Sequence, residues 1–177
     1  LNRDGSVKVR TTFQPDTTLI KSMARLGLTF EVEDAYDHIT YLGRGEHETY
    51  IDRNQSGKIG IYETTPERMF HYYVVPQSTG NRTDVRWMKL TDDAGKGCWV
   101  ESDSPFQFST IAFPDVMLEK ARHINELERN GKITVHLDAK QVGVGTATCG
   151  PGVQSQYLVP LTKQTFDFII YPVKNRE

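Results

Sequence analysis

The sequence predicts an all-β fold, an antiparallel sandwich or barrel, from two observations. Short runs rich in β-branched and aromatic residues recur along the chain, and several alternate polar with apolar side chains, as half-buried strands do. Pairs such as Asp-Gly, Ser-Gly and Asn-Gly separate these runs at short intervals and mark turns. The expected strands are GSVKVRTTFQP (5–15), GLTFEVE (27–33), HITYLG (38–43), HYYVVPQ (71–77), TDVRWMKL (83–90), FQFSTIAF (106–113), GKITVHLDAKQVGVG (131–145), SQYLVPL (155–161) and QTFDFIIYPV (164–173).

The run KITVHLDAKQV illustrates the strand pattern. Ile133, Val135 and Leu137 share one face, and the polar residues between them share the other, which predicts a sheet with one face in water. FPDVMLEKARHINEL (113–127) differs, because its apolar residues recur at helical spacing and Asp115 can cap its start. We therefore expect one short helix in an otherwise all-β chain.

Length and charge bound the class of protein. A chain of 177 residues, 37% apolar and 10% aromatic, suits one packed domain, residues 1–177. Mixed charges with a net charge of −2 predict no nucleic-acid partner, and no apolar run reaches the roughly 18 residues of a membrane span. The chain starts at Leu1 in a strand-like pattern, so we expect a fragment of a longer protein, and its compartment, cytoplasmic or periplasmic, stays open. Cys98 and Cys149 could pair or stay free.

The stretch YLGRGEHETYIDR (41–53) is the first candidate site. Its two glycines could admit an anion, and Arg44, His47 and Glu48 could bind a ligand or act in acid-base catalysis. A phosphate-cradling loop would continue into a helix, which this stretch does not. Adjacent strand residues point to opposite faces, so Glu46, His47 and Glu48 do not converge on a metal. The alternative is a glycine turn whose Asp52–Arg53 pair holds it to neighbouring loops.

A second candidate lies in GNRTDVRWMKL (80–90). Asn81 belongs to a turn, and Arg82, Asp84 and Arg86 have the spacing of one strand face. We expect a charge ladder there rather than direct sugar recognition. Trp87 is on the opposite face from Arg86 and is expected in the core.

The glycine-rich stretch VGVGTATCGPGVQ (142–154) predicts a long turn that projects beyond the sheet. Thr146, Thr148 and Cys149 lie at its tip, followed by Gly150. Loops on a rigid scaffold often carry binding groups, and the alternative is an exposed connector with an unreactive cysteine.

Other chemistry has weak support in the sequence. His38, His71, His123 and His136 are scattered without the close partners of a zinc site, so no metal site is predicted. No G-x-S-x-G elbow is present.

Four segments taken in order, YLGRGEHETYIDR, YYVVPQSTGNRTDVRWMKL, FQFSTIAFPDVMLEKARHINEL and ITVHLDAKQVGVGTATCGPGV, resemble the C-terminal, small-chain domain of the large β-galactosidases of glycoside hydrolase family two. The resemblance extends from about Gly5 to Val173. It implies the galactose-mutarotase-like supersandwich, two antiparallel sheets packed face to face. It also implies that the nucleophile and the acid-base glutamate belong to an upstream (β/α)8 barrel, so this chain alone holds no catalytic residue.

The same resemblance implies partners and cofactors. The expected partners are the catalytic barrel of the same polypeptide and a galactoside or oligosaccharide substrate, with a homo-oligomer as a further expectation. The fragment itself needs no cofactor, and any Mg²⁺ or Na⁺ would be bound at the barrel of the parent enzyme.

The resemblance places two loops at the rim of the active-site pocket. Thr146, Thr148, Cys149 and Gly150 match a turn that carries a sugar-stacking tryptophan in the family's best-known form, and Cys149 stands near that position. GRGEHETYIDR matches a loop of the type GRGPHENYPDR, with Glu46, Thr49 and Ile51 as departures. We expect this second loop, with its Arg44, His47, Glu48, Asp52 and Arg53, to dock domains and shape the rim.

Two alternatives remain at this point. An independent carbohydrate-binding module would need an exposed aromatic platform, for which Tyr41, Tyr72, Tyr73 and Trp99 are candidates. An aldose mutarotase would need a histidine and a carboxylate facing each other in a groove.

Overall fold

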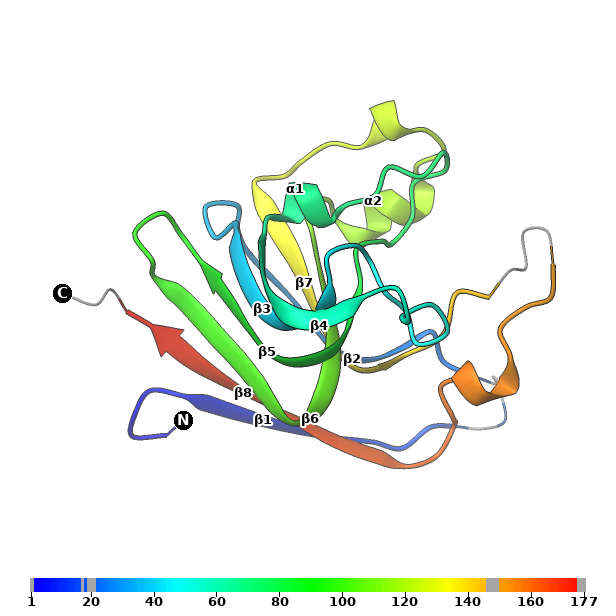
Figure 1. Ribbon diagram of the computed structural model, residues 1–177, viewed down its shortest axis with the longest axis horizontal. Coiled ribbons are helices and arrows are strands. Elements are labelled where there is room, and N and C mark those ends of the chain that lie inside the picture. The colour runs from blue at the N-terminus through cyan, green and yellow to red at the C-terminus, as the bar shows by residue number, and fades with distance from the viewer. Residues whose placement is uncertain (1, 17, 19–21, 146–149, 175–177) are drawn as a thin grey trace.

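The computed structural model describes residues 2–16, 18, 22–145 and 150–174, and it is an antiparallel β-sandwich, as the sequence predicts (Figure 1). Two short α-helices and two 3₁₀ turns accompany the strands of this part of the chain. The strands are β1 (Val7–Phe13), β2 (Arg25–Glu33), β3 (His38–Gly45), β4 (Lys58–Thr64), β5 (Arg82–Thr91), β6 (Gly97–Ile111), β7 (Lys132–Gln141) and β8 (Gln164–Val173).

The long strand β6 connects the two layers. Its first part pairs with β5 and β8, which gives a layer in the order β1-β8-β6-β5-β3-β4. Its last residues, 107–111, pair with β7, which in turn pairs with β2. The core lies between these layers, where apolar side chains of β7 such as Val135 meet Met88, Val100 and Phe168 from the other layer.

The helix prediction is only partly right. Helix α2 (Asp115–Lys120) starts where expected but ends after six residues, and a 3₁₀ turn, η1 (Ile124–Glu126), follows it. Asp115 does not cap the helix, because its carboxylate bonds to His136 Nε2 at 3.1 Å instead.

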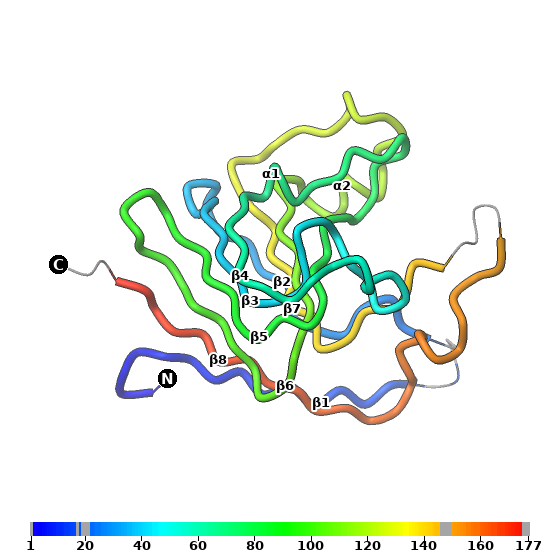
Figure 2. Tube along the Cα trace, in the orientation of Figure 1, coloured from blue at the N-terminus to red at the C-terminus, as the bar shows by residue number. Residues whose placement is uncertain are grey.

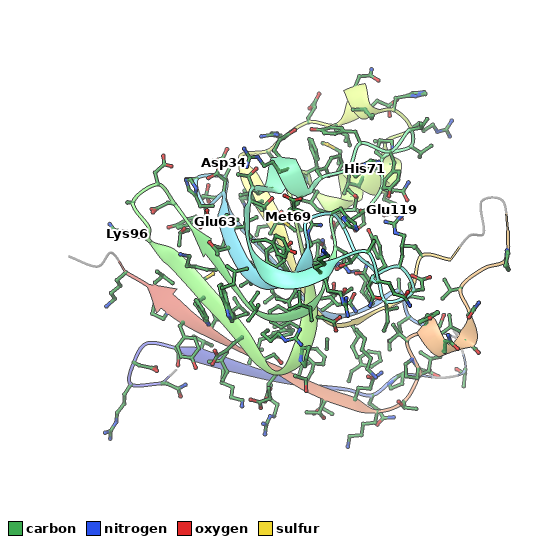
Figure 3. The ribbon with its side chains drawn as sticks, viewed as in Figure 1. Asp34, Glu63, Met69, His71, Lys96 and Glu119 are labelled. Carbon is green, nitrogen blue, oxygen red and sulfur yellow. The ribbon has the colours of Figure 1, made fainter. Side chains whose placement is uncertain are left out.

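A second helix, α1 (Pro66–Met69), was not predicted. Thr65 caps it, because its hydroxyl accepts the N–H of Arg68, and Pro66 stands at the first turn, where a missing N–H costs nothing. The helix places Met69 in the interior (Figure 3), where Thr110 Oγ1 lies 3.2 Å from its sulfur. Helices α1 and α2 gather at one end of the sandwich (Figure 1).

Two predicted strands are wrong, and one strand was missed. Residues 71–77 form no strand: Pro76 has no N–H to donate, and the hydroxyl groups of Tyr72 and Tyr73 bond to nearby glutamates. Residues 155–161 contain the 3₁₀ turn η2 (Ser155–Tyr157) instead. The missed strand is β4, whose alternating pattern the prediction overlooked.

The expected wet face of β7 is also wrong. Thr134, His136 and Asp138 are as buried as the apolar residues between them. Thr134 donates to the carbonyl of Phe113, and Arg25 of β2 forms an ion pair with Asp138 at 2.5 Å. The segment around α2 therefore covers this face, and its polar groups are satisfied internally.

The ends of the described chain lie on the same side of the molecule (Figure 2). Among the described residues, no helix is long and apolar enough to cross a membrane.

Candidate functional site

Glu48 is the centre of a hydrogen-bonded cluster at the end of the sandwich where β3 ends and β5 begins. The carboxylate accepts hydrogen bonds from the Thr79 hydroxyl at 2.7 Å, the Gly80 N–H at 2.9 Å, the Tyr50 hydroxyl at 3.2 Å, the Tyr73 hydroxyl and Arg53 Nη2 at 2.6 Å. A carboxylate offers about four lone-pair positions, so five donors saturate it. No acceptor position of Glu48 is left for a ligand.

The pKa of Glu48 also indicates that its carboxylate holds neighbouring loops together and does not bind a ligand. Burial would raise its pKa, but hydrogen bonds from Tyr73, Gly80, Thr79 and Arg53 outweigh burial and lower the pKa to about 2. The side chain of Glu48 is only 11% exposed. A carboxylate with this pKa stays ionised near neutral pH and is a poor general acid or base.

Asp52 joins the two loops that the sequence singled out. Its carboxylate accepts the N–H of Val144 at 3.0 Å and the N–H of Gly145 at 2.8 Å. Gly143 packs against the same carboxylate, and a Cβ at Gly143 would come within 2.5 Å of it. One interpretation of the sequence was that the Asp52–Arg53 pair holds the 41–53 stretch to neighbouring loops. The contacts of Asp52 confirm it for that residue.

Two further bonds fix the start of the glycine-rich stretch. Val142 N–H donates to the Ala24 carbonyl at 2.9 Å, and Gly143 N–H donates to the Tyr157 carbonyl at 3.1 Å. Thr146, Thr148 and Cys149 lie outside the described residues, and Gly150, where the described chain resumes, is exposed.

Arg82 does not take part in a charge ladder, contrary to the prediction. Its side chain is turned inward at 2% exposure and donates to the Tyr41 hydroxyl and to the carbonyls of Gly80, Asn81 and Glu46. The register of β5 shifts after Arg82, so the regular alternation that the prediction assumed is broken. Arg82 is a structural residue.

Asn81 is buried as well. Its amide nitrogen donates to the Thr49 carbonyl at 2.9 Å and to Gln107 Oε1 at 2.8 Å, while its side-chain oxygen has no partner among the described residues. Asn81 therefore links the loop after β3 to β6.

Asp84 pairs with Arg44 rather than with Arg82. Arg44 Nε bonds to the Asp84 carboxylate, and Arg44 Nη1 donates to the Gly57 carbonyl at 2.9 Å. Asp84 has a φ of 54°, in the left-handed region that non-glycine residues rarely adopt. This conformation explains why its carboxylate faces β3.

His47 and Arg53, the remaining predicted residues of the 41–53 stretch, are more exposed than Glu48. His47 Nε2 lies 2.8 Å from the Ser56 hydroxyl, and Arg53 stacks over the ring of Tyr50 at 5.3 Å. The described residues contain no group of three His, Cys, Asp or Glu that could hold a metal ion.

A cleft of about 520 Å³ lies beside this loop cluster. Its lining includes Ile51 and Asp84 from the candidate loops, Gln107 from β6 and Tyr157 from the segment after the glycine-rich stretch. Of these residues, Asp84 was predicted from the sequence, whereas Gln107 and Tyr157 were not. No local motif marks either residue: Gln107 is placed by the pairing of β6 with β7, and Tyr157 by the hydrogen bond from the Gly143 N–H to its carbonyl.

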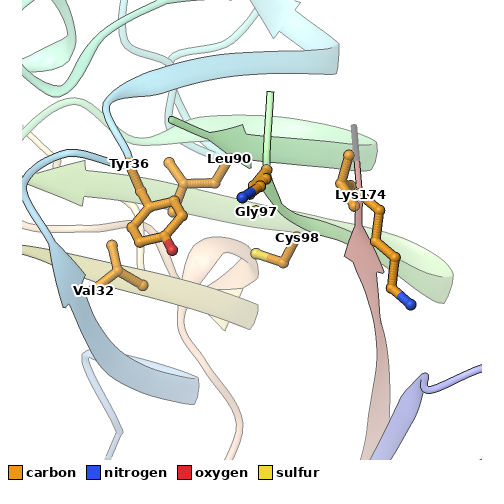
Figure 4. A pocket seen from close by; sticks show the side chains of 8 residues that line it. Val32, Tyr36, Leu90, Gly97, Cys98 and Lys174 are labelled. Atoms are coloured by element: carbon orange, nitrogen blue, oxygen red, sulfur yellow. The ribbon is translucent and has the colours of Figure 1, made fainter. Parts of the chain in front are cut away.

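A larger cleft of about 960 Å³ lies at the opposite end of β3 (Figure 4). Val32, Tyr36, Leu90 and Cys98 line it, and none of the predicted site residues does. Burial raises the pKa of Cys98 to about 11, so its thiol is protonated and unreactive near neutral pH.

The structure also bears on the alternatives. His136 faces Asp115 but is only 2% exposed, so this pair does not line an open groove as a mutarotase would require. Of the platform candidates, Tyr41 is buried at 1% exposure, whereas Tyr72 is 44% exposed. Trp99 is half-buried and stacks on Trp87 at 4.2 Å between ring centroids. Trp87 is therefore on the outer face of the sheet and not in the core as predicted.

The fold and the loop cluster define a β-sandwich domain with its polar loops tied together at one end. Residues 1–170 match the family model described as beta galactosidase small chain, and the chain belongs to this family.

Curated relatives agree with this assignment. The chain is 31% identical over 145 residues to "Beta-galactosidase" of Priestia megaterium, a match that covers 82% of this chain and 14% of that protein. It is 30% identical over 169 residues to "Beta-galactosidase" of Kluyveromyces lactis, covering 95% and 16%, respectively. It is 34% identical over 146 residues to "Beta-galactosidase BgaC" of Bifidobacterium adolescentis, covering 80% and 14%. The chain thus corresponds to a small part of much longer glycoside hydrolases.

Proposed function

We propose that this chain is the C-terminal accessory domain of a β-galactosidase that hydrolyses terminal non-reducing β-D-galactosides. In this proposal the domain has the galactose-mutarotase-like supersandwich fold, docks to the catalytic barrel of the same polypeptide and completes the rim of its active-site pocket. Family membership and the names of the relatives support the proposal, as does the small share of each relative that the chain matches.

The observation that carries the rim role is the Asp52 contact. Its carboxylate ties the 41–53 stretch to Val144 and Gly145, at the root of the glycine-rich loop 142–154. These are the two loops expected at the rim. A carboxylate that binds two backbone N–H groups fixes the direction in which a loop leaves the sheet, and misplacing a substrate-contacting loop by about 1 Å can cost on the order of 100-fold in rate.

The chemistry itself would belong to the barrel. Retaining glycoside hydrolysis uses two carboxyl groups about 5–5.5 Å apart. In this chain Glu48, a carboxylate of the candidate loops that is only 11% exposed, is saturated by internal donors. Any Mg²⁺ or Na⁺ and any contacts between subunits would likewise be properties of the parent enzyme.

The test uses the full-length polypeptide with Asp52→Asn. Asparagine keeps one acceptor oxygen but loses the charge that binds both amides, so the rim loop loosens while the barrel is untouched. We expect KM for lactose to rise roughly threefold to tenfold with a smaller change in kcat, because ground-state contacts at the rim are lost.

Asp93→Asn is the matched control. Asp93 is a fully exposed carboxylate in the turn between β5 and β6, at the other end of the sandwich. Unchanged KM in Asp52→Asn, or an equal rise in Asp93→Asn, would refute the rim role. Hydrolysis of lactose by residues 1–177 alone would refute the accessory role.

A further inference from the structure

An apolar row crosses the outer face of the larger layer. Strand register places Ile61 of β4 opposite Leu42 of β3, Leu42 opposite Trp87 of β5, Trp87 opposite Glu101 of β6, and Glu101 opposite Ile169 of β8. Ile59, Trp99 and Tyr171 flank this row, two residues along their strands. We call Ile59, Ile61, Leu42, Trp87, Trp99, Ile169 and Tyr171 the outer band.

The outer band faces away from the core. Tyr41, Met88, Val100 and Phe168, each next in sequence to a band residue, are buried in the core at 1% exposure or less. Successive side chains of a strand point to opposite faces, so the band residues lie on the other side of the sheet.

This composition is unusual for a face in contact with water. Outer positions of an antiparallel sheet are normally polar, yet Ile61 is 66% exposed and Ile59 is 47% exposed on the edge strand β4. Trp87 and Trp99 remain only half-buried after stacking on each other. Contiguous apolar surface of this kind marks an interaction site, and an uncovered edge strand invites pairing with other chains.

The charged groups around the band suit burial under a protein partner. Glu101 is the charged member of the row, and its oxygens accept the Tyr171 hydroxyl at 2.8 Å and the Trp99 N–H at 3.4 Å. At the far edge of the layer, Lys8 pairs with Asp167 at 3.0 Å. Lys89, opposite Trp99 on the same face, makes no ion pair among the described residues, so the apolar centre is bordered by Lys89, by the hydrogen-bonded Glu101 and by the Lys8–Asp167 pair. An apolar centre with a polar rim is the usual anatomy of a protein–protein interface.

A sugar is a poorer fit to the same surface. Sugar stacking needs a free aromatic face, and because Trp87 and Trp99 are stacked with an interplanar angle of 19°, each has one ring face covered by the other and only one face left for a sugar. Glu101, the polar group best placed to orient a sugar, has both oxygens engaged.

We infer that the outer band is the surface through which this domain packs against an apolar face of the remainder of its own polypeptide. The inference rests on one part of the proposed function, that the chain is one domain of a longer enzyme. The relatives indicate what covers the outer band. The matches span only 14 to 16% of the relatives' length, so each relative has far more protein outside the match than within it.

The test compares cysteine variants in the full-length polypeptide. Ile61→Cys places a thiol in the outer band, and Val116→Cys, on α2 at 59% exposure, places one on a surface of similar exposure outside the band. Ile59→Cys serves as a second band variant if Ile61→Cys unfolds at a lower temperature than the wild type. We expect a maleimide reagent to modify the band thiol at least tenfold more slowly than the Val116→Cys thiol, with the unsubstituted polypeptide as the blank.

The outcomes separate the possible occupants. Equal labelling rates overturn the inference. Slow labelling that becomes fast on dilution, together with a falling molecular mass, shows that a second copy covers the band and also overturns it. Labelling that slows only when lactose or a polysaccharide is added overturns it in favour of a sugar site. Activity is measured separately, so slow labelling in a polypeptide that does not hydrolyse galactosides would refute the proposed function and leave the inference standing.

Discussion

Replacing Glu48 with glutamine should remove a pH-dependent contribution to stability. The pKa of Glu48 is lowered from 4.5 to about 2, and each pKa unit corresponds to about 1.4 kcal/mol, so the ionised carboxylate contributes about 3 kcal/mol to the free energy of unfolding. The side chain is only 11% exposed, so solvent screens this contribution little. We expect Glu48→Gln to lose about this amount at pH 7.

The sign of the pH dependence follows from the direction of the shift. A lowered folded-state pKa gives stability that is present above the unfolded value of 4.5 and is lost as the pH falls through the folded value of about 2. The difference between wild type and Glu48→Gln should therefore be constant above about pH 5.5 and nearly gone at pH 2.

Urea unfolding followed by circular dichroism between pH 2 and 7 measures this difference. Glu119→Gln is the matched control, because Glu119 is exposed on α2 (Figure 3) and makes no side-chain bond to the described residues. A difference below about 1 kcal/mol at pH 7, or one that does not shrink in acid, would refute the reasoning that buried hydrogen bonds hold Glu48 ionised.

Three further changes test other parts of the structure. Arg82→Met leaves the Tyr41 hydroxyl and three carbonyls without their donor, so the free energy of unfolding should fall by about 3 kcal/mol, against under about 1 kcal/mol for the exposed Arg86→Met. In a Cys149→Ser background, Cys98, with its pKa raised to about 11, should react with a disulfide reagent at pH 8 at least ~100-fold more slowly than a free thiol. Asp115→Asn should cost under about 1 kcal/mol in urea unfolding, and this cost should vanish in acid, because the His136 hydrogen bond lowers the pKa of Asp115 below 3.8.

The strand pattern predicted most of the fold, because alternation reports directly on which side of a sheet a residue faces. It failed where long-range contacts decide burial. His136 and Asp138 look solvent-facing in sequence, but Asp115 and Arg25, distant along the chain, pair with them and permit burial. No local window of sequence contains both members of either pair.

The candidate site likewise contains one residue whose role could be predicted from the sequence and one whose role could not. That Asp52 holds its loop to a neighbouring loop was predictable in kind, because short acidic side chains in loops readily bind backbone N–H groups. Its partners, Val144 and Gly145, however, lie 92 and 93 residues further along the chain, and no local pattern names them. The inward turn of Arg82 was not predictable, because it depends on shifts of register along β5 and on the positive φ of Asp84. Such irregularities leave no mark in the periodicity on which the ladder prediction rested.

The energetics of the loop cluster favour a supporting role over a catalytic one. Catalytic carboxylates need a pKa near the working pH and a free oxygen to meet a substrate, whereas Glu48 has a pKa of about 2 and five donors on two oxygens. Asp52 likewise spends both oxygens on backbone N–H groups. A cluster built this way ties its loops to one another through carboxylates that are already hydrogen-bonded, which agrees with the proposal that the bond-breaking groups belong to another domain.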